Sequence, residues 1–251
     1  MGSAAEIRKG RISAVKKKKK EKKHMLNIQN YTKRFGDKIA VDDLSLYIAA
    51  GEICAFIGHN GAGKTTTLKA CCGLLKPDGG TIMVNGIDIQ KDPIACKKIM
   101  AYIPDNPDLY EFLTGYEYLN FVADMYGVSE ADRKARMEAL AERLDIKNAL
   151  PNLISECSHG MKQKIAVIGA LIHEPKLILM DEPFVGLDPI AAHELKEIMA
   201  EHCRNGGAIF FSTHVLEVAE KLCDNVAIIK NGKLIAHGTM DSVRGDGSLE
   251  Q

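Results

Sequence analysis

The chain has 251 residues, with 33 basic and 33 acidic side chains in balance. This length suits one large α/β domain with room for a subdomain. No apolar run approaches the roughly 18 residues that cross a bilayer, so the composition excludes a membrane-spanning helix, and we expect a soluble protein whose membrane role requires a partner.

The first 24 residues concentrate positive charge, with five consecutive lysines at 16–20. They hold ten of the 33 basic residues and only two acidic ones, so residues 25–251 carry 23 basic and 31 acidic residues and a net charge of −8. We interpret residues 1–24 as an appended leader before a native start at Met25; the alternative is a basic arm for nucleic acid or an anionic membrane surface. The acidic remainder argues against nonspecific DNA binding.

In chain order, the first elements are β-rich. Alternating apolar and polar residues predict half-buried antiparallel strands at 26–28 and 44–48. A continuous apolar run at 52–57 predicts a buried strand, and a helix at 65–75 follows it. Further strands are predicted at 80–86, ending in an Asn-Gly turn, and at 99–103.

Residues 106–160 change to helical character, with apolar spacing at 116–126 and a charged amphipathic pattern at 130–144. After residue 161 helices and strands alternate. The apolar strands 177–180 and 208–211 show no polar alternation, which is typical of central parallel strands. The later elements are predicted as helices at 161–173, 190–203 and 215–222 and as strands at 177–181, 208–213, 225–229 and 234–237.

This order predicts an α/β protein with a mostly parallel sheet, an N-terminal antiparallel β subdomain and an inserted helical subdomain. We divide the chain into residues 25–105 (the β subdomain and the first part of the core), 106–160 (the helical subdomain) and 161–251 (the rest of the core).

The segment between the strand at 52–57 and the helix at 65–75 fits the phosphate-binding pattern G-x-x-x-x-G-K-[ST]. Its glycines let backbone N–H groups point at phosphate oxygens, and the following helix adds its positive dipole end. Lys64 can bridge the β- and γ-phosphates, and Thr65 can bind Mg²⁺. The predicted nucleotide-binding residues here are Gly58, His59, Asn60, Gly61, Ala62, Gly63, Lys64, Thr65 and Thr66.

Three polar side chains follow two of the predicted central strands. Asp181 and Glu182 end one strand, at the edge where α/β sheets place their ligands. We expect Asp181 to hold Mg²⁺ and Glu182 to orient the attacking water, on opposite sides of the strand. His214 follows the next strand and could bond the γ-phosphate or that water.

The seven cysteines form no C-x-x-C pair. They are typical of reduced, mostly buried thiols, and their spacing argues against a metal site.

This ordered set of motifs resembles the nucleotide-binding subunit of ATP-binding-cassette (ABC) transporters over residues 26–240. The resemblance assigns residues 58–65 to the Walker A loop, 177–182 to the Walker B strand and catalytic Glu, 186–188 to the D-loop with Asp188, and His214 to the switch histidine. It also implies that Ser158 and Gly160 of a signature loop contact ATP bound by a second subunit.

Two motifs depart from the family pattern. His159 replaces a glycine of the signature loop, which restricts its backbone. Asp105 stands at the Gln-loop position, where it could contact Mg²⁺ or water but cannot donate a hydrogen bond when ionised; Asn106 is the alternative. Family members stack adenine on an aromatic residue, for which Phe35 is the candidate and Tyr31 the runner-up, with core packing as the other interpretation of Phe35.

The resemblance therefore implies an ATPase that binds ATP and Mg²⁺, dimerises around two ATP molecules, homo- or heteromerically, and drives a separately encoded permease. It would lie in the cytoplasm on the inner face of the membrane, and the motifs favour export; the cargo is not encoded here. One alternative is a non-transport ATPase acting on nucleic acid or ribosomes, which the acidic body disfavours. Another is a nucleotide-binding module with negligible hydrolysis.

Overall fold

The computed structural model describes residues 24–245, so most of the predicted leader lies outside the described residues. His24, its last residue, pairs with Ala49 at the start of the first strand.

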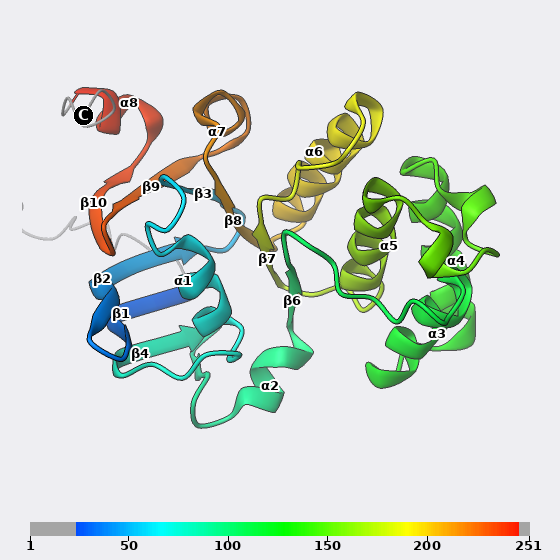
Figure 1. The fold of residues 1–251 in the computed structure, drawn as a ribbon, viewed down its shortest axis with the longest axis horizontal. Helices are drawn as coiled ribbons and strands as arrows, with labels where there is room; N and C mark the ends of the chain where they lie inside the picture. The colour runs from blue at the N-terminus through cyan, green and yellow to red at the C-terminus, as the bar shows by residue number, and fades with distance from the viewer. Residues whose placement is uncertain (1–23, 246–251) are drawn as a thin grey trace, which may run out of the picture.

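Two sheets form the framework of the molecule (Figure 1). The first is antiparallel, in the order β2-β1-β4-β5, and consists of β1 (His24–Phe35), β2 (Lys38–Ala49), β4 (Gly79–Val84) and β5 (Ile87–Asp88). The second has the order β10-β9-β3-β8-β7-β6 and is parallel except for β10. Its strands are β3 (Ile53–Ile57), β6 (Met100–Ile103), β7 (Leu177–Asp181), β8 (Ala208–Thr213), β9 (Asn225–Lys230) and β10 (Lys233–Gly238).

The helices occupy the space between the sheets, the far face of the second sheet and a separate lobe. They are α1 (Lys64–Cys71), α2 (Pro93–Lys98), α3 (Gly115–Met125), α4 (Glu130–Arg143), α5 (His159–Leu171), α6 (Pro189–Arg204), α7 (Leu216–Leu222) and α8 (Met240–Gly245), with 3₁₀ turns at Lys147–Ala149 and Ile154–Glu156. No helix in this described part is long and apolar enough to span a membrane.

The layers explain the apolar central strands. Helix α1 contacts β2 and β4 of one sheet and β7 of the other, whereas α6 and α7 cover the opposite face. Strand β3 accordingly divides its side chains between two cores: Cys54 and Phe56 face the antiparallel sheet, and Ile53 and Ala55 face the helices. Burial on both faces removes any need for polar alternation.

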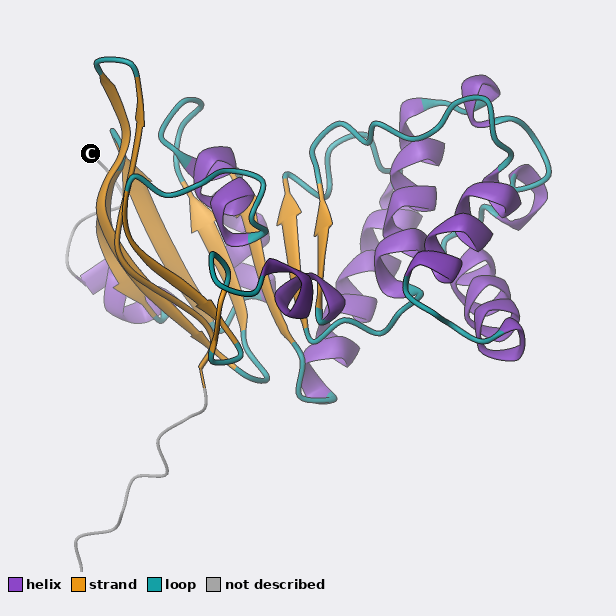
Figure 2. Cartoon of the chain, turned by 90° about the horizontal axis from the view of Figure 1, so that it is seen from below, coloured by secondary structure: helices purple, strands orange, loops and turns teal. Residues whose placement is uncertain are grey.

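Helices α3, α4 and α5 pack together as a lobe beside the sheets (Figure 2). Thr114 begins α3 with a capping box to Glu117, and Ser129 caps α4. These caps satisfy amide groups that would otherwise lack partners at the helix starts.

The predicted fold class is confirmed, with two kinds of difference in detail. Strand β2 starts six residues before the predicted segment 44–48. The residues before that segment lack its regular alternation of apolar and polar side chains, but they still pair with β1. Helix α2 was not predicted, although Asp92 caps it and Pro93 stands in its first turn, a recognised start signal. All seven cysteines are free, and six are buried, as expected.

Candidate active site

The glycine-rich loop connects β3 to α1. Gly63 precedes the helix with φ of 114°, and a Cβ there would lie 2.9 Å from the Ala40 carbonyl oxygen, so only glycine fits. The Lys64 side chain folds back along the loop, and its Nζ donates to the carbonyl oxygens of Gly58 at 2.6 Å and His59 at 3.3 Å. The ammonium group is thus buried inside the curve of the loop.

Asp181 is the last residue of β7, and its carboxylate is buried. Thr65 Oγ1 donates to Asp181 Oδ2 at 2.6 Å, and the Ser212 hydroxyl donates to the other oxygen. The loop threonine and the strand aspartate, 116 positions apart in the sequence, are therefore in direct contact.

Glu182 lies between two potential cations. Its Oε1 is 3.6 Å from Lys64 Nζ, and its Oε2 is 3.0 Å from His214 Nδ1, which therefore carries the proton in this contact. The expectation that Asp181 and Glu182 lie on opposite sides of a strand was wrong: β7 ends at Asp181, and Glu182 has a left-handed backbone with φ of 45°. Both carboxylates consequently line one cavity.

That cavity has a volume of about 500 Å³ and opens beside the loop. Phe35 lines it with half of its surface exposed, which does not fit the core-packing interpretation. Tyr31 is fully buried, its hydroxyl donates to the Thr66 carbonyl oxygen at 3.4 Å, and it does not line the cavity. Of the sequence candidates, the cavity is lined by Phe35, Asn60, Gly61, Gly63, Lys64, Thr65, Thr66, Asp105, Asp181 and Glu182.

Sequence reasoning missed five lining residues: Lys38, Ile39, Ala40, Asn231 and Gly232. The last two form the turn between β9 and β10, and Gly232 N donates to the Ala62 carbonyl oxygen at 2.9 Å. The Asn-Gly pair between two strands was a readable turn signal, but nothing in its spacing indicates that the turn lies against the phosphate loop.

The signature loop and the D-loop meet each other away from this cavity. Ser158 caps α5, and a Cβ on Gly160 would come within 2.5 Å of the Gly186 carbonyl oxygen. Asp188 caps α6 and lies 2.8 Å from Lys164 Nζ; the hydrogen bond from that ammonium group lowers the pKa of Asp188. Ser158, Gly160 and Asp188 do not line the cavity of their own chain.

The donor set suits a magnesium ion. Asp181 is a buried carboxylate that accepts hydrogen bonds from the Thr65 and Ser212 hydroxyls, and Thr65 supplies a neighbouring oxygen. Asp105 lines the same cavity with a third oxygen-bearing side chain. Carboxylate and hydroxyl oxygens beside a phosphate loop are the ligands that Mg²⁺ takes.

Fold and cavity together define a P-loop nucleotide-binding protein. The profile described as ABC transporter matches residues 41–185. Among relatives, the ABC-type transporter ATP-binding protein EcsA of Bacillus subtilis (strain 168) is 36% identical over 88% of this chain and 89% of its own length, and NatA of the same organism is 37% identical over 87% and 91%. A solved ATP-binding subunit of an ABC transporter superposes with a TM-score of 0.85 at 38% identity, covering 90% of this chain and 95% of that one.

The chain therefore belongs to the ABC transporter family, as an ATP-binding subunit with ATPase activity.

Proposed function

We propose that this subunit closes with a second ATP-binding subunit around two ATP molecules and that the cycle of closing and opening drives export through a separate permease. One observation supports the formation of a dimer. Ser158 and Gly160, which the family resemblance assigns to ATP, do not line the cavity that holds Lys64, Asp181 and Glu182. A second chain is needed to bring a signature loop to this cavity.

Within one site, each residue has a separate task. Lys64 and the loop amides hold the phosphates, and Thr65, Asp181 and Asp105 hold Mg²⁺, which neutralises phosphate charge when bound. Glu182 accepts a proton from the attacking water, and His214 orients Glu182 through their 3.0 Å contact. Phe35 offers its exposed ring to the adenine.

Names of relatives favour a membrane partner and export. The linearmycin resistance ATP-binding protein LnrL of Bacillus subtilis and the Nod factor export ATP-binding protein I of Burkholderia lata are 35% and 36% identical to this chain. A solved relative, CbiO1 of Clostridium perfringens, is described as part of the complex CbiONQ and has a TM-score of 0.76 at 26% identity. We accordingly place this subunit on the inner face of the membrane, bound to a permease encoded elsewhere.

Light scattering during size-exclusion chromatography tests the dimer. The Glu182→Gln variant traps ATP if Glu182 is the base, so it should elute as a dimer with ATP and Mg²⁺ and as a monomer without them. Lys64→Ala in the same background should stay monomeric because its phosphates are not held. If the Glu182→Gln variant remained monomeric with saturating ATP, the homodimer would be excluded.

A further inference from the structure

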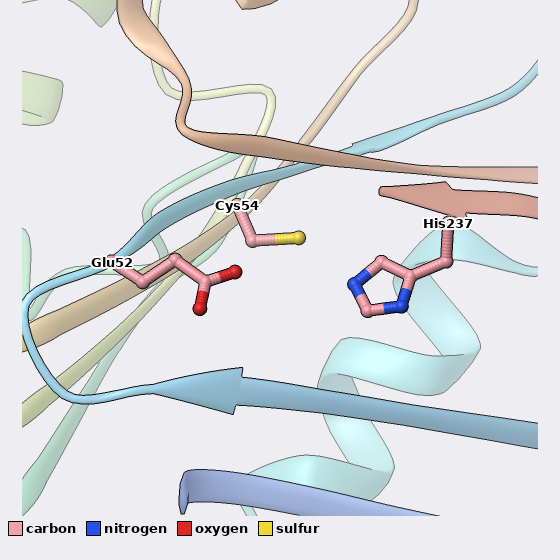
Figure 3. A group of neighbouring side chains, drawn as sticks. All are labelled: Glu52, Cys54 and His237. Atoms are coloured by element: carbon pink, nitrogen blue, oxygen red, sulfur yellow. The ribbon is translucent and has the colours of Figure 1, made fainter. Parts of the chain in front are cut away.

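A second group of polar side chains lies between the two sheets, away from the phosphate loop. Figure 3 shows Glu52, Cys54 and His237 pointing toward one another; Glu52 directly precedes β3, Cys54 lies in β3 and His237 lies in β10. One donor atom from each, a carboxylate oxygen, the thiol sulfur and a ring nitrogen, lies within 4.8 Å of the other two. Sequence spacing gave no sign of this group because Cys54 and His237 are 183 positions apart.

Two of these donors lack the hydrogen bonds that buried polar groups normally have. Among residues 24–245, His237 Nε2 is buried with no hydrogen-bond partner, and the contact of Cys54 Sγ is a weak one of 3.9 Å with the neighbouring Ala55 carbonyl oxygen. A buried nitrogen without a hydrogen bond destabilises the folded state unless another group binds to it. The group therefore holds ligand atoms that the protein itself leaves unused.

The carboxylate is held in place by its own neighbours. Asn225 Nδ2 donates to one oxygen of Glu52 at 2.7 Å, and Ala49 N donates to the other at 2.9 Å. Each oxygen keeps a free lone pair, and such outer hydrogen bonds orient metal ligands in proteins. Within the described residues, no salt bridge neutralises the buried Glu52 carboxylate, so its negative charge is available to attract a cation.

We propose that Glu52, Cys54 and His237 form a binding site for Zn²⁺ with three protein ligands and a fourth position for water. Thiolate, imidazole and carboxylate together are typical zinc ligands, whereas Mg²⁺ and Ca²⁺ take oxygen. Zinc bonds of about 2.0–2.3 Å require the donors to close by roughly 1 Å. His237 can supply this movement because β10 is an edge strand with an irregular register at 234–236.

Tyr47, about half exposed, contacts the His237 ring edge-on, with 5.3 Å between the ring centroids. Binding would fasten β10 to β3, the strand that leads into the phosphate loop, and it does not depend on the proposed transport function. The expected effect is on stability and not on phosphate chemistry.

Cobalt titration tests the proposal without nucleotide. Reduced, chelator-treated protein receives Co²⁺ alone, and we expect one equivalent to give the charge-transfer absorption of a Co²⁺–thiolate bond. Zn²⁺ should displace it and, at a hundred times its Kd, raise Tm by about 5–10 °C. His237→Gln should weaken binding at least tenfold while keeping the fold, and Cys54→Ser should abolish the thiolate band.

Cys71→Ser is the matched control because it removes another fully buried thiol on α1. It should keep the band. Absence of cobalt binding, binding without a thiolate band, or a band unchanged in His237→Gln would each overturn the zinc site, and none of these results would bear on the ATP site.

Discussion

Glu182 is the residue on which the chemistry of the site depends. Its carboxylate is held from two sides, by Lys64 Nζ at 3.6 Å and by His214 Nδ1 at 3.0 Å. Its left-handed backbone conformation is uncommon for a residue other than glycine. The Ser212 hydroxyl oxygen accepts a hydrogen bond from the Glu182 backbone N–H, with 3.1 Å between nitrogen and oxygen. This geometry turns the carboxylate from the strand into the cavity.

Substitution separates the two roles in this pair. Glu182→Gln should lower the ATP turnover number at least 100-fold because the proton acceptor is lost. His214→Gln should lower it less, since the carboxylate stays and loses only its orientation. A phosphate-release assay with saturating ATP measures both. Glu130→Gln, on the exposed start of α4, serves as the control; turnover near wild type in Glu182→Gln would refute the assignment.

At the scale of elements, α5 and the D-loop are interlocked. Gly186 has φ of 80°, and a Cβ there would lie 2.4 Å from His159 Cδ2. Lys164 on α5 adds the ion pair with Asp188 at 2.8 Å. The histidine that replaces a glycine of the family pattern thus packs its ring on the D-loop of its own chain.

A double-mutant cycle measures this contact. Gly186→Ala should lower the free energy of unfolding by about 2–3 kcal/mol, from backbone strain plus the clash. In a His159→Ala background only the strain remains, so the loss should fall to about 1 kcal/mol. Gly127→Ala is the control because Gly127 also has positive φ but open space around it; urea unfolding should show the same loss for it in both backgrounds. Equal losses for Gly186→Ala in both would show that the ring does not matter.

Element order was predictable from sequence, whereas contacts between distant elements were not. The loop at 58–65 and the Asp181 strand end were predictable because each motif carries its own local geometry. The turn at Asn231 and Gly232 and the group at Glu52, Cys54 and His237 depend on how β9 and β10 pack beside β3. The periodicity of apolar residues predicts which face of a strand is buried, but it does not predict which strands lie beside it. The left-handed backbone conformation at Glu182 could not be predicted from the sequence, because glutamate rarely adopts positive φ.

At the scale of the whole molecule, three partly buried histidines lie outside the nucleotide site. The His173 ring stacks on Tyr126 at 3.6 Å between centroids, and its Nε2 donates to the Met100 carbonyl oxygen at 3.2 Å. His202 packs against Gly207, and His237 faces Glu52. Burial lowers the pKa of all three, and Arg136 adds to this at His173, whereas Glu52 opposes it at His237.

Lowered histidine pKa values make the fold sensitive to acid. Above about pH 6.5, the pKa of histidine in the unfolded chain, the rings are neutral in both the folded and the unfolded state. Their contribution to the free energy of unfolding is then fully present. As pH falls toward the folded pKa, the unfolded chain binds protons first, so stability decreases by at most about 1.4 kcal/mol per pH unit for each histidine. Urea unfolding at pH 7.5 and 5.5, with a chelator present, should show this decrease. His173→Gln should reduce it because glutamine does not titrate, whereas His193→Gln, on the exposed face of α6, should leave it unchanged. An identical decrease in His173→Gln would assign the acid sensitivity to the other buried groups.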